Sequence, residues 1–321
     1  METPFQALAE LCEKLEATNK RLAMLDLVAE FLKSLETREI EPAASMILGR
    51  SFPKWSQQTL EVSWATLSEI IKRITRVEWK VFIEAFSKTG DVGSATKILF
   101  ENSKIEKQAT LFERKLTIVE VRRSLEAIAE TTGYGSREKK ERLIEALLSA
   151  ASPVEAKYLV KIFIGEMRTG FHEGLMEQAV SKAFQIPLEV VQKANMTIGD
   201  IGEVATIAKM EGKEGLLKIG FKVFRPVRLM LAQMANDAAE ALKEHDDKTA
   251  FEYKLDGARV QIHKLGDEVR IFSRRLTDVT ESLPEIVETA RKNVKTKEAI
   301  LEGEVIAVDN LGFPVPFQHL M

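Results

Sequence analysis

A chain of 321 residues exceeds the usual size of a single hydrophobic core, so two domains are the natural expectation. Hydrophobic residues make up 45% of the sequence, but no apolar run approaches the roughly 20 residues that cross a bilayer, which excludes a protein built from transmembrane helices. The net charge of -3 does not by itself indicate a nucleic-acid-binding protein, so any such binding needs Lys and Arg gathered on one face.

Up to about residue 215, apolar residues recur at steps of three and four, which predicts an almost entirely helical domain. The clearest stripe comprises Leu22, Leu25, Val28, Phe31, Leu32 and Leu35. Residues 117–120 and 152–155 have the spacing of capping boxes, and the second adds proline at the first helical position. Turns are expected at residues 90–93, 133–136 and 198–202.

Three further observations in this region concern the N-terminal residues, the single cysteine and the tryptophans. The first residues lack the basic and apolar segments of a secretory signal, which favours an intracellular protein. Cys12 lies on an apolar helical face, so a buried structural thiol is favoured over a nucleophile. The three tryptophans are expected in the core or at an interface: Trp55, Trp64 and Trp79.

After residue 215 the pattern changes. A basic, irregular stretch from Gly215 to Pro226 predicts a linker, and one helix is expected from about Pro226 to Glu244. A period of two then predicts strands at residues 251–255, 259–264, 268–273 and 300–308. Gly266-Asp267 predicts a hairpin turn, and residues 284–293 are expected to form a helix. The sequence therefore predicts a multidomain α and α/β (α+β) protein.

The strongest chemical signal is the pattern K-x-D-G-x-R between Lys254 and Arg259. Alternate side chains of a strand share a face, so Glu252, Lys254 and Asp256 are expected to project together. Gly257 lets the chain turn or approach a ligand closely, and this change of direction could bring Arg259 toward the same pocket.

A lysine is a nucleophile only when its amine is neutral, and an ordinary lysine is almost wholly protonated at neutral pH. Neighbouring carboxylates oppose the loss of that proton unless a divalent metal engages them. The segment therefore predicts a nucleotide and metal site in which Lys254 attacks an α-phosphate and Mg²⁺ offsets the phosphate charge. The alternative is a surface Lys–Asp pair that arose by chance.

The segment from Glu252 to Arg259 resembles motif I of the covalent nucleotidyltransferases, which include ATP- and NAD-dependent DNA ligases, RNA ligases and mRNA capping enzymes. Other segments are similar, in order and spacing, to ATP-dependent DNA ligases of the archaeal and eukaryotic type. They are the element after motif I (272–274), motif III (301–309), the segment after it (316–318), and two signatures of the helical DNA-binding domain and its connection to the catalytic domain (167–180 and 225–233).

The resemblance implies roles for individual residues. Lys254 would take AMP from ATP, Glu252 would help to seat the adenine, and Asp256 would lie near the ribose and the nicked strand end. Arg259 and Arg274 match arginines that contact AMP or the 5′-phosphate, a task that suits a planar guanidinium group. Glu304 matches the carboxylate of motif III that binds the ribose or a metal ion, whereas Glu302 has no equally good match and is left out.

The resemblance also implies an architecture and partners. Residues 1–215 would form a helical DNA-binding domain, and residues 216–321 a linker with the first part of a mostly antiparallel-sheet adenylation domain. ATP and Mg²⁺ would be the cofactors, nicked double-stranded DNA the substrate, and a sliding clamp a further candidate partner. We expect a monomer in the cytoplasm, at the nucleoid of a prokaryote, that acts in replication, repair and recombination and does not bind a membrane.

The family's later lysine motifs and its C-terminal oligonucleotide-binding barrel do not occur before Met321. We therefore expect the 321-residue chain not to seal nicks and to adenylate itself poorly or not at all. The helical domain is expected to fold independently and to bind DNA weakly and in a salt-sensitive way.

In the helical region, unpaired backbone N–H groups at turns can contact DNA phosphates without side-chain charge. The candidates for this contact are Arg168, Thr169, Gly170, Thr197 and Gly199, with His172, Gly174 and Gly202 beside them. For each of them a purely structural role as a turn residue or helix cap stays open. The other histidines, His245, His263 and His319, lack metal-ligand spacing, and exposure or ordinary packing is expected.

Two alternatives remain open. The first is an RNA ligase or capping-type guanylyltransferase, which the long helical region argues against and which labelling with ATP, GTP and NAD would test. The second is a non-catalytic helical DNA-binding or partner-binding module, which an intact motif I argues against. A Lys254 amine in bulk solvent, away from Arg259, Arg274 and Glu304, would argue against the enzyme.

Overall fold

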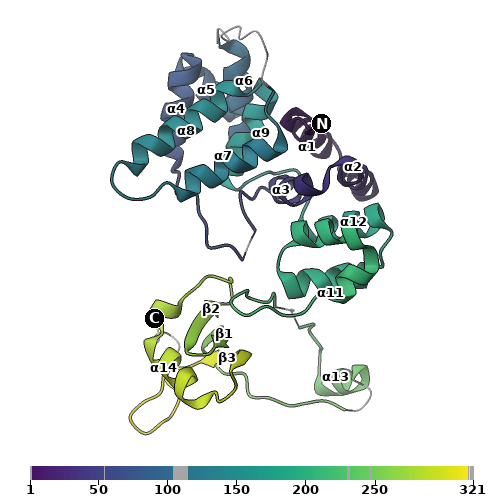
Figure 1. The fold of residues 1–321 in the computed structure, drawn as a ribbon, viewed down its shortest axis with the longest axis vertical. Helices are drawn as coiled ribbons and strands as arrows, with labels where there is room; N and C mark the ends of the chain where they lie inside the picture. The colour runs from purple at the N-terminus through teal and green to yellow at the C-terminus, as the bar shows by residue number, and fades with distance from the viewer. Residues whose placement is uncertain are drawn as a thin grey trace. The chain divides into compact units, whose positions relative to one another are not determined.

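The computed structural model describes residues 2–53, 55–103, 115–229, 232–245, 248–316 and 318. Contacts between residues divide the chain into two compact units, residues 1–219 and 220–321 (Figure 1). Across the described residues, every helix is too short or too polar to cross a membrane.

The first unit is helical throughout its described residues. Its helices are α1 (Phe5–Glu16), α2 (Arg21–Ser34), α3 (Thr37–Ile47), α4 (Trp64–Thr75), α5 (Trp79–Thr89), α6 (Val92–Asn102), α7 (Ile118–Glu130), α8 (Ser136–Ala150), α9 (Pro153–Ile164), α10 (Glu173–Phe184), α11 (Leu188–Ile198) and α12 (Ile201–Leu217). One continuous hydrophobic core runs through the unit and takes side chains from all of these helices.

Local sequence signals set many of these helix ends. Both predicted capping boxes form, at Thr117 before α7 and at Ser152 before α9, and each hydroxyl accepts a hydrogen bond from a backbone N–H that would otherwise have no partner. Gly90 ends α5 in the left-handed conformation, and the side chain of Asp91 then caps α6. The helical prediction for this region is therefore confirmed at the level of single caps.

The core confirms most of the predicted stripe on α2 and corrects one position. Leu25, Val28 and Leu32 are buried, but Leu22 is 73% exposed because it lies in the first turn of α2, outside the buried face. Cys12 is buried, as expected, and burial raises the pKa of its thiol. That thiol is a packing group.

The second unit contains a three-stranded antiparallel sheet in the order β2-β1-β3. Its elements are α13 (Ala238–Glu244), β1 (Ala258–Leu265), β2 (Glu268–Ser273), a 3-10 turn (Thr280–Ser282), α14 (Pro284–Asn293) and β3 (Glu298–Val305). Gly266, with φ of 60°, forms the predicted hairpin between β1 and β2. Val260, Val269, Ile271 and Ala290 form a small core where α14 covers one face of the sheet.

The predicted fold class, a helical domain followed by a domain with a mostly antiparallel sheet, is confirmed, whereas one predicted strand is absent and two predicted elements have other bounds. Residues 251–255 do not form a strand, since no described residue pairs with them in a ladder. The helix expected from Pro226 to Glu244 is limited to α13, which begins where Asp237 caps it. The strand expected at 300–308 is β3, which starts and ends earlier. Phe317 and His319 lie outside the described residues, as do residues 230 and 231 of the segment 225–233.

Candidate nucleotide site and candidate DNA interface

The segment that carries Lys254 is exposed. Residues 251–256 form no strand, and the N–H of Leu255 donates to the carbonyl oxygen of Tyr253, so the prediction that Glu252, Lys254 and Asp256 share a strand face is wrong. Lys254 Nζ donates to the carbonyl oxygen of Leu255 at 3.3 Å and has no other hydrogen bond or ion pair within the described part of the chain. The structure therefore does not join Lys254 to the arginines and the carboxylate with which it was predicted to act. By the condition stated above, this exposed position of Lys254 argues against the enzyme.

Gly257 fixes the point at which this segment meets the sheet. A Cβ at Gly257 would lie 2.3 Å from the carbonyl oxygen of Val305 and 2.8 Å from Cγ2 of Ile306. Only glycine permits so close an approach between two backbones. The segment thus enters the sheet directly beside the end of β3.

Arg259 lies opposite Glu304 in the pairing of β1 with β3. Its Nε donates to Glu302 Oε1 at 2.9 Å, and both side chains of this ion pair are 41% exposed. The hydrogen bond to Glu302 and the charges of Glu302 and Glu304 hold the pKa of Arg259 above its usual range. Since side chains two residues apart on a strand share a face, Glu302 and Glu304 both lie on the Arg259 side of the sheet.

The sequence had pointed to Glu304 and set Glu302 aside, but Glu302 is the direct partner of Arg259. The signal that could have found it is the Glu-Gly-Glu pattern on a strand paired with the arginine strand. Glu304 is half-buried and, among the described residues, makes no hydrogen bond or ion pair. Arg274 is exposed in the turn after β2, and it too has no such contact within those residues.

This end of the sheet combines permanent cations with acceptor oxygens at its surface. Arg259 and Arg274 can bind phosphate oxygens, and a carboxylate such as Glu304 can accept hydrogen bonds from ribose hydroxyls. The described residues contain no group of three or more His, Cys, Asp or Glu side chains suited to a metal ion. Chemically, the face suits a phosphorylated ligand better than a metal ion held by protein alone.

The five DNA-contact candidates of the helical unit divide by exposure. Arg168 and Gly170 are exposed, and both have positive φ, at 53° and 70°. Thr169, Thr197 and Gly199 are buried. The hydroxyl of Thr169 accepts from the N–H of Phe171, and that of Thr197 donates to the carbonyl of Lys193, so both hydroxyls serve the local fold. Arg168 and Gly170 are the candidates that a DNA backbone can reach.

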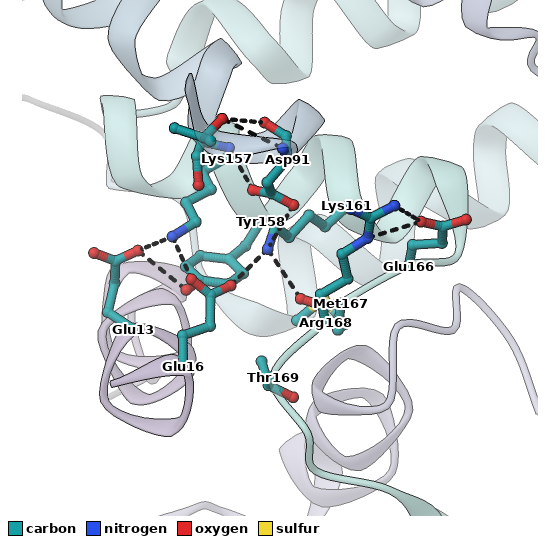
Figure 2. A network of polar contacts seen from close by, with 12 residues as sticks. Glu13, Glu16, Asp91, Lys157, Tyr158, Lys161, Glu166, Met167, Arg168 and Thr169 are labelled. Atoms are coloured by element: carbon teal, nitrogen blue, oxygen red, sulfur yellow. Dashed lines mark hydrogen bonds and ion pairs between the residues drawn. The ribbon is translucent and has the colours of Figure 1, made fainter. Parts of the chain in front are cut away.

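Arg168 projects from a loop that a buried ionic network holds in place (Figure 2). Lys161 Nζ contacts Glu16 at 2.6 Å, Asp91 at 3.2 Å and the carbonyl oxygen of Met167 at 3.0 Å, which uses all three of its donors. The guanidinium of Arg168 pairs with Glu166 and donates to the carbonyl oxygen of Gly90. The loop is thus tied to α9 and to the turn before α6.

The same network fully compensates its charges. Lys157 contacts Glu13 and Glu16, and Tyr158 donates to Glu13 at 3.1 Å. Burial alone would raise the pKa of Glu13, but hydrogen bonds from Lys157 and Lys97 lower it to about 2. These lysines therefore stabilise the fold and position the loop, and they are not free to bind phosphate.

The chain is similar to known protein families over most of its length. Residues 4–181 match the family described as DNA ligase N terminus, and residues 229–321 match the ATP dependent DNA ligase domain. The sequence is 38% identical to a DNA ligase of Thermococcus onnurineus over 317 residues and 40% identical to one of Thermococcus fumicolans over 317 residues. It is 39% identical to a DNA ligase of Archaeoglobus fulgidus over 318 residues. Each alignment covers 99% of this chain and 56% of the relative, so the chain spans about 56% of the length of these relatives.

Proposed function

Because the chain belongs to the family of ATP-dependent DNA ligases, of the archaeal and eukaryotic type, we propose that it supplies the DNA-binding and nucleotide-binding elements of an enzyme that seals nicks in duplex DNA. Such nicks arise in replication, repair and recombination. The observation that carries the proposal is the pairing of β1 with β3, which sets Arg259 opposite Glu304 beside the segment that bears Lys254.

In this proposal Lys254 is the nucleophile of the first step. Its Nζ attacks the α-phosphorus of ATP, a nitrogen–phosphorus bond forms, and the bond to the bridging oxygen breaks with release of pyrophosphate. The AMP group then passes to the 5′-phosphate at the nick. Finally the 3′-hydroxyl attacks that phosphate and AMP leaves. Each step depends on charge stabilisation and in-line placement more than on acid–base catalysis.

The residues of the sheet have distinct tasks in this scheme. Arg259 and Arg274 hold phosphate oxygens and favour the loss of a proton from a nearby lysine amine, because their positive charge disfavours a second cation. Glu304 accepts from the ribose, Glu252 lies toward the adenine, and Asp256 lies near the ribose and the strand end. Since Lys254 makes only a local contact, we propose that its segment settles on the sheet when ATP binds.

Mg²⁺ fits this site only as an ion shared with the substrate. Glu304 lies opposite Arg259 and has no ion pair among the described residues, and Mg²⁺ is commonly held by one or two carboxylates together with substrate phosphates. Its contribution would be to offset the charge of the triphosphate.

The helical unit would hold the DNA backbone. Gly170 and Arg168 offer an exposed backbone and a guanidinium on a loop that Lys161 keeps rigid. Thr169, Thr197 and Gly199 would act by shaping their turns, since they are buried. This mode of contact suits a chain whose net charge is -3.

The test is label transfer from ATP, GTP and NAD, each labelled in the nucleotide that would be transferred. It is done with this chain and with a fusion that supplies the remaining C-terminal part of the Thermococcus fumicolans ligase. In the fusion we expect stable label from ATP alone, its loss in Lys254→Ala, and its retention in Lys248→Ala, which removes an exposed lysine nearby. This chain by itself is expected to take up little or no label. Label that survives Lys254→Ala, or that comes from GTP or NAD, would refute the proposal. Nick sealing by the labelled fusion completes the test.

A further inference from the structure

Residues 222–228, here called the connector, are bound to β1 by side chains. The backbone N–H of Phe224 donates to His263 Nδ1 at 2.9 Å. The N–H of Val227 donates to Gln261 Oε1 at 2.9 Å, and Gln261 Nε2 donates to the carbonyl oxygen of Val227 at 2.6 Å. The amide of Gln261 therefore pairs with Val227 in the way that a backbone peptide pairs with a neighbouring strand.

These hydrogen bonds define the protonation of His263. Because Nδ1 accepts from Phe224, the ring is neutral and carries its proton on Nε2. That nitrogen lies 3.4 Å from Gln261 Oε1, so His263 donates to the same oxygen that receives the Val227 N–H. Both side chains are buried, at 0% and 5% exposure. Every polar atom of the two side chains is thus engaged.

Further contacts fix the turn within the connector at Phe224. Phe224 has φ of 64°, a conformation that an aromatic residue keeps only where its surroundings require it. The guanidinium of Arg270 on β2 lies over its ring, 4.7 Å from the centroid. His263 also packs edge-on against Phe272. The connector is held from β1 and β2 together.

We propose that Gln261 and His263 are positioning residues that form a clasp, which makes the connector part of the second unit and sets the length of the tether to the helical unit. With the clasp closed, the chain between the end of α12 at Leu217 and the start of the connector at Lys222 is residues 218–221. Fully extended, four residues reach about 14 Å. With the clasp open, the connector is released from β1, so the tether lengthens to include at least residues 218–228.

This difference matters for the proposed ligase, on which the functional consequence rests. A short tether keeps the DNA-binding unit at a high effective concentration near the nucleotide site, and that concentration falls steeply once the tether lengthens beyond the span it must bridge. Gln261 also lies two residues from Arg259 on the same strand face, so the clasp borders the candidate nucleotide site.

Amide hydrogen exchange tests the clasp directly. In the unchanged chain the amides of Phe224 and Val227 are expected to be protected. In Gln261→Leu, which can neither accept from the Val227 N–H nor donate to its carbonyl oxygen, and in His263→Leu, which cannot accept from Phe224, both amides are expected to exchange about tenfold faster or more. His263→Asn, whose side-chain oxygen lies near the position of Nδ1, should restore protection at Phe224.

Matched controls separate this effect from general damage. Gln192→Leu and His245→Leu make the same chemical changes at exposed positions and should leave both amides unchanged. Protection of the Ile271 amide, which lies in the small core of the sheet, reports whether the sheet stays folded. If Phe224 and Val227 keep their protection in both clasp variants while Ile271 stays protected, the clasp is refuted.

A distance measurement tests the tether. Cys12 is buried, so spin labels can be placed on new cysteines at the exposed Tyr134 and Glu285, one in each unit. The distribution of label distances is expected to broaden in Gln261→Leu and His263→Leu and to stay unchanged in the controls. If the label distances stay unchanged in variants whose connector amides exchange quickly, the clasp does not set the length of the tether and the proposal is refuted. Neither measurement needs ATP or DNA. The clasp and the proposed function can therefore be refuted separately, since the function is tested by label transfer to Lys254.

Discussion

In the helical unit, Lys157 and Lys161 are 6% and 3% exposed and each contacts at least two carboxylates. In the second unit, Arg259 and its partner Glu302 are both 41% exposed, and Lys254 lies in an exposed segment. The first unit thus encloses these two lysines beside its continuous core, whereas the second leaves Arg259 and Lys254 at the surface of a small sheet. Buried, compensated charge holds a loop in place, while exposed charge is available to a ligand.

The largest effect is expected where the buried network is broken. Lys161→Met removes the cation that contacts Glu16, Asp91 and the carbonyl oxygen of Met167. The helical unit should lose about 3 kcal/mol of stability, which is near the lower end of the range for broken buried ion pairs because both carboxylates are partly exposed. Urea unfolding measures this. Lys33→Met, which breaks an exposed pair with Glu30, should cost under about 1 kcal/mol, and equal losses in the two variants would contradict the comparison.

A second prediction concerns the approach of Gly257 to β3. Gly257→Ala places a Cβ against the carbonyl oxygen of Val305, so the backbone must shift and the second unit should lose roughly 1–3 kcal/mol. Gly303→Ala is the matched control in the same sheet, since a Cβ there meets nothing within 4 Å. Thermal unfolding followed in the second unit distinguishes the two. A Gly257→Ala variant as stable as Gly303→Ala would show that the close approach is dispensable.

Acid should affect the two units in different pH windows. Burial lowers the pKa of His263 from 6.5 to about 4, so its contribution to stability is complete above pH 6.5 and is lost as the pH falls toward 4, by roughly 2 kcal/mol. The pKa of Glu13 falls from 4.5 to about 2, so the helical unit should weaken only below pH 4.5. The charged residues on the strands and the connector around His263 are Arg259, Lys264, Glu268, Arg270, Glu298, Glu302, Glu304, Lys222, Arg225 and Arg228.

Unit-specific unfolding against pH checks this prediction. His263→Asn should abolish the loss of stability of the second unit between pH 6.5 and 4. Glu13→Gln should reduce the loss of stability of the helical unit below pH 4.5. A helical unit that weakens between pH 6.5 and 4.5 together with the sheet would contradict the assignment of these windows.

The smallest effect on stability is expected at Arg259. Its ion pair with Glu302 is exposed, so Arg259→Gln should change the free energy of unfolding by under about 1 kcal/mol. Under the proposed function it should nevertheless reduce label transfer from ATP at least about tenfold, the cost of a charge-assisted hydrogen bond to phosphate. Arg73→Gln, which breaks a similarly exposed pair with Glu145, should leave label transfer unchanged. A large loss of stability in Arg259→Gln would assign the arginine to the fold instead.

Features encoded within a few residues could be predicted from the sequence. Thr117 and Ser152 cap helices as expected, Gly266 forms the hairpin, and α14 has the predicted bounds, because each depends on hydrogen bonds between near neighbours. The candidate site residues came from a motif resemblance, and the family matches support the family assignment without testing any single role.

Features that depend on distant residues could not be read in this way. Residues 251–255 alternate like a strand, yet a strand exists only where a neighbour pairs with its backbone, and no described residue does so. The partnership of Arg259 with Glu302 follows from the register of β1 on β3 across 43 positions of sequence.

The sequence by itself determined the helical character of the first unit, the strands around the hairpin and the ligase-like motifs, since capping, periodicity and turn chemistry act locally. Tertiary structure alone decided that Lys161 is buried among carboxylates, that Lys254 is exposed, and that Gln261 and His263 hold the connector. Burial and pairing depend on contacts between segments that are distant in the sequence, and such contacts cannot be inferred from a local pattern of residues.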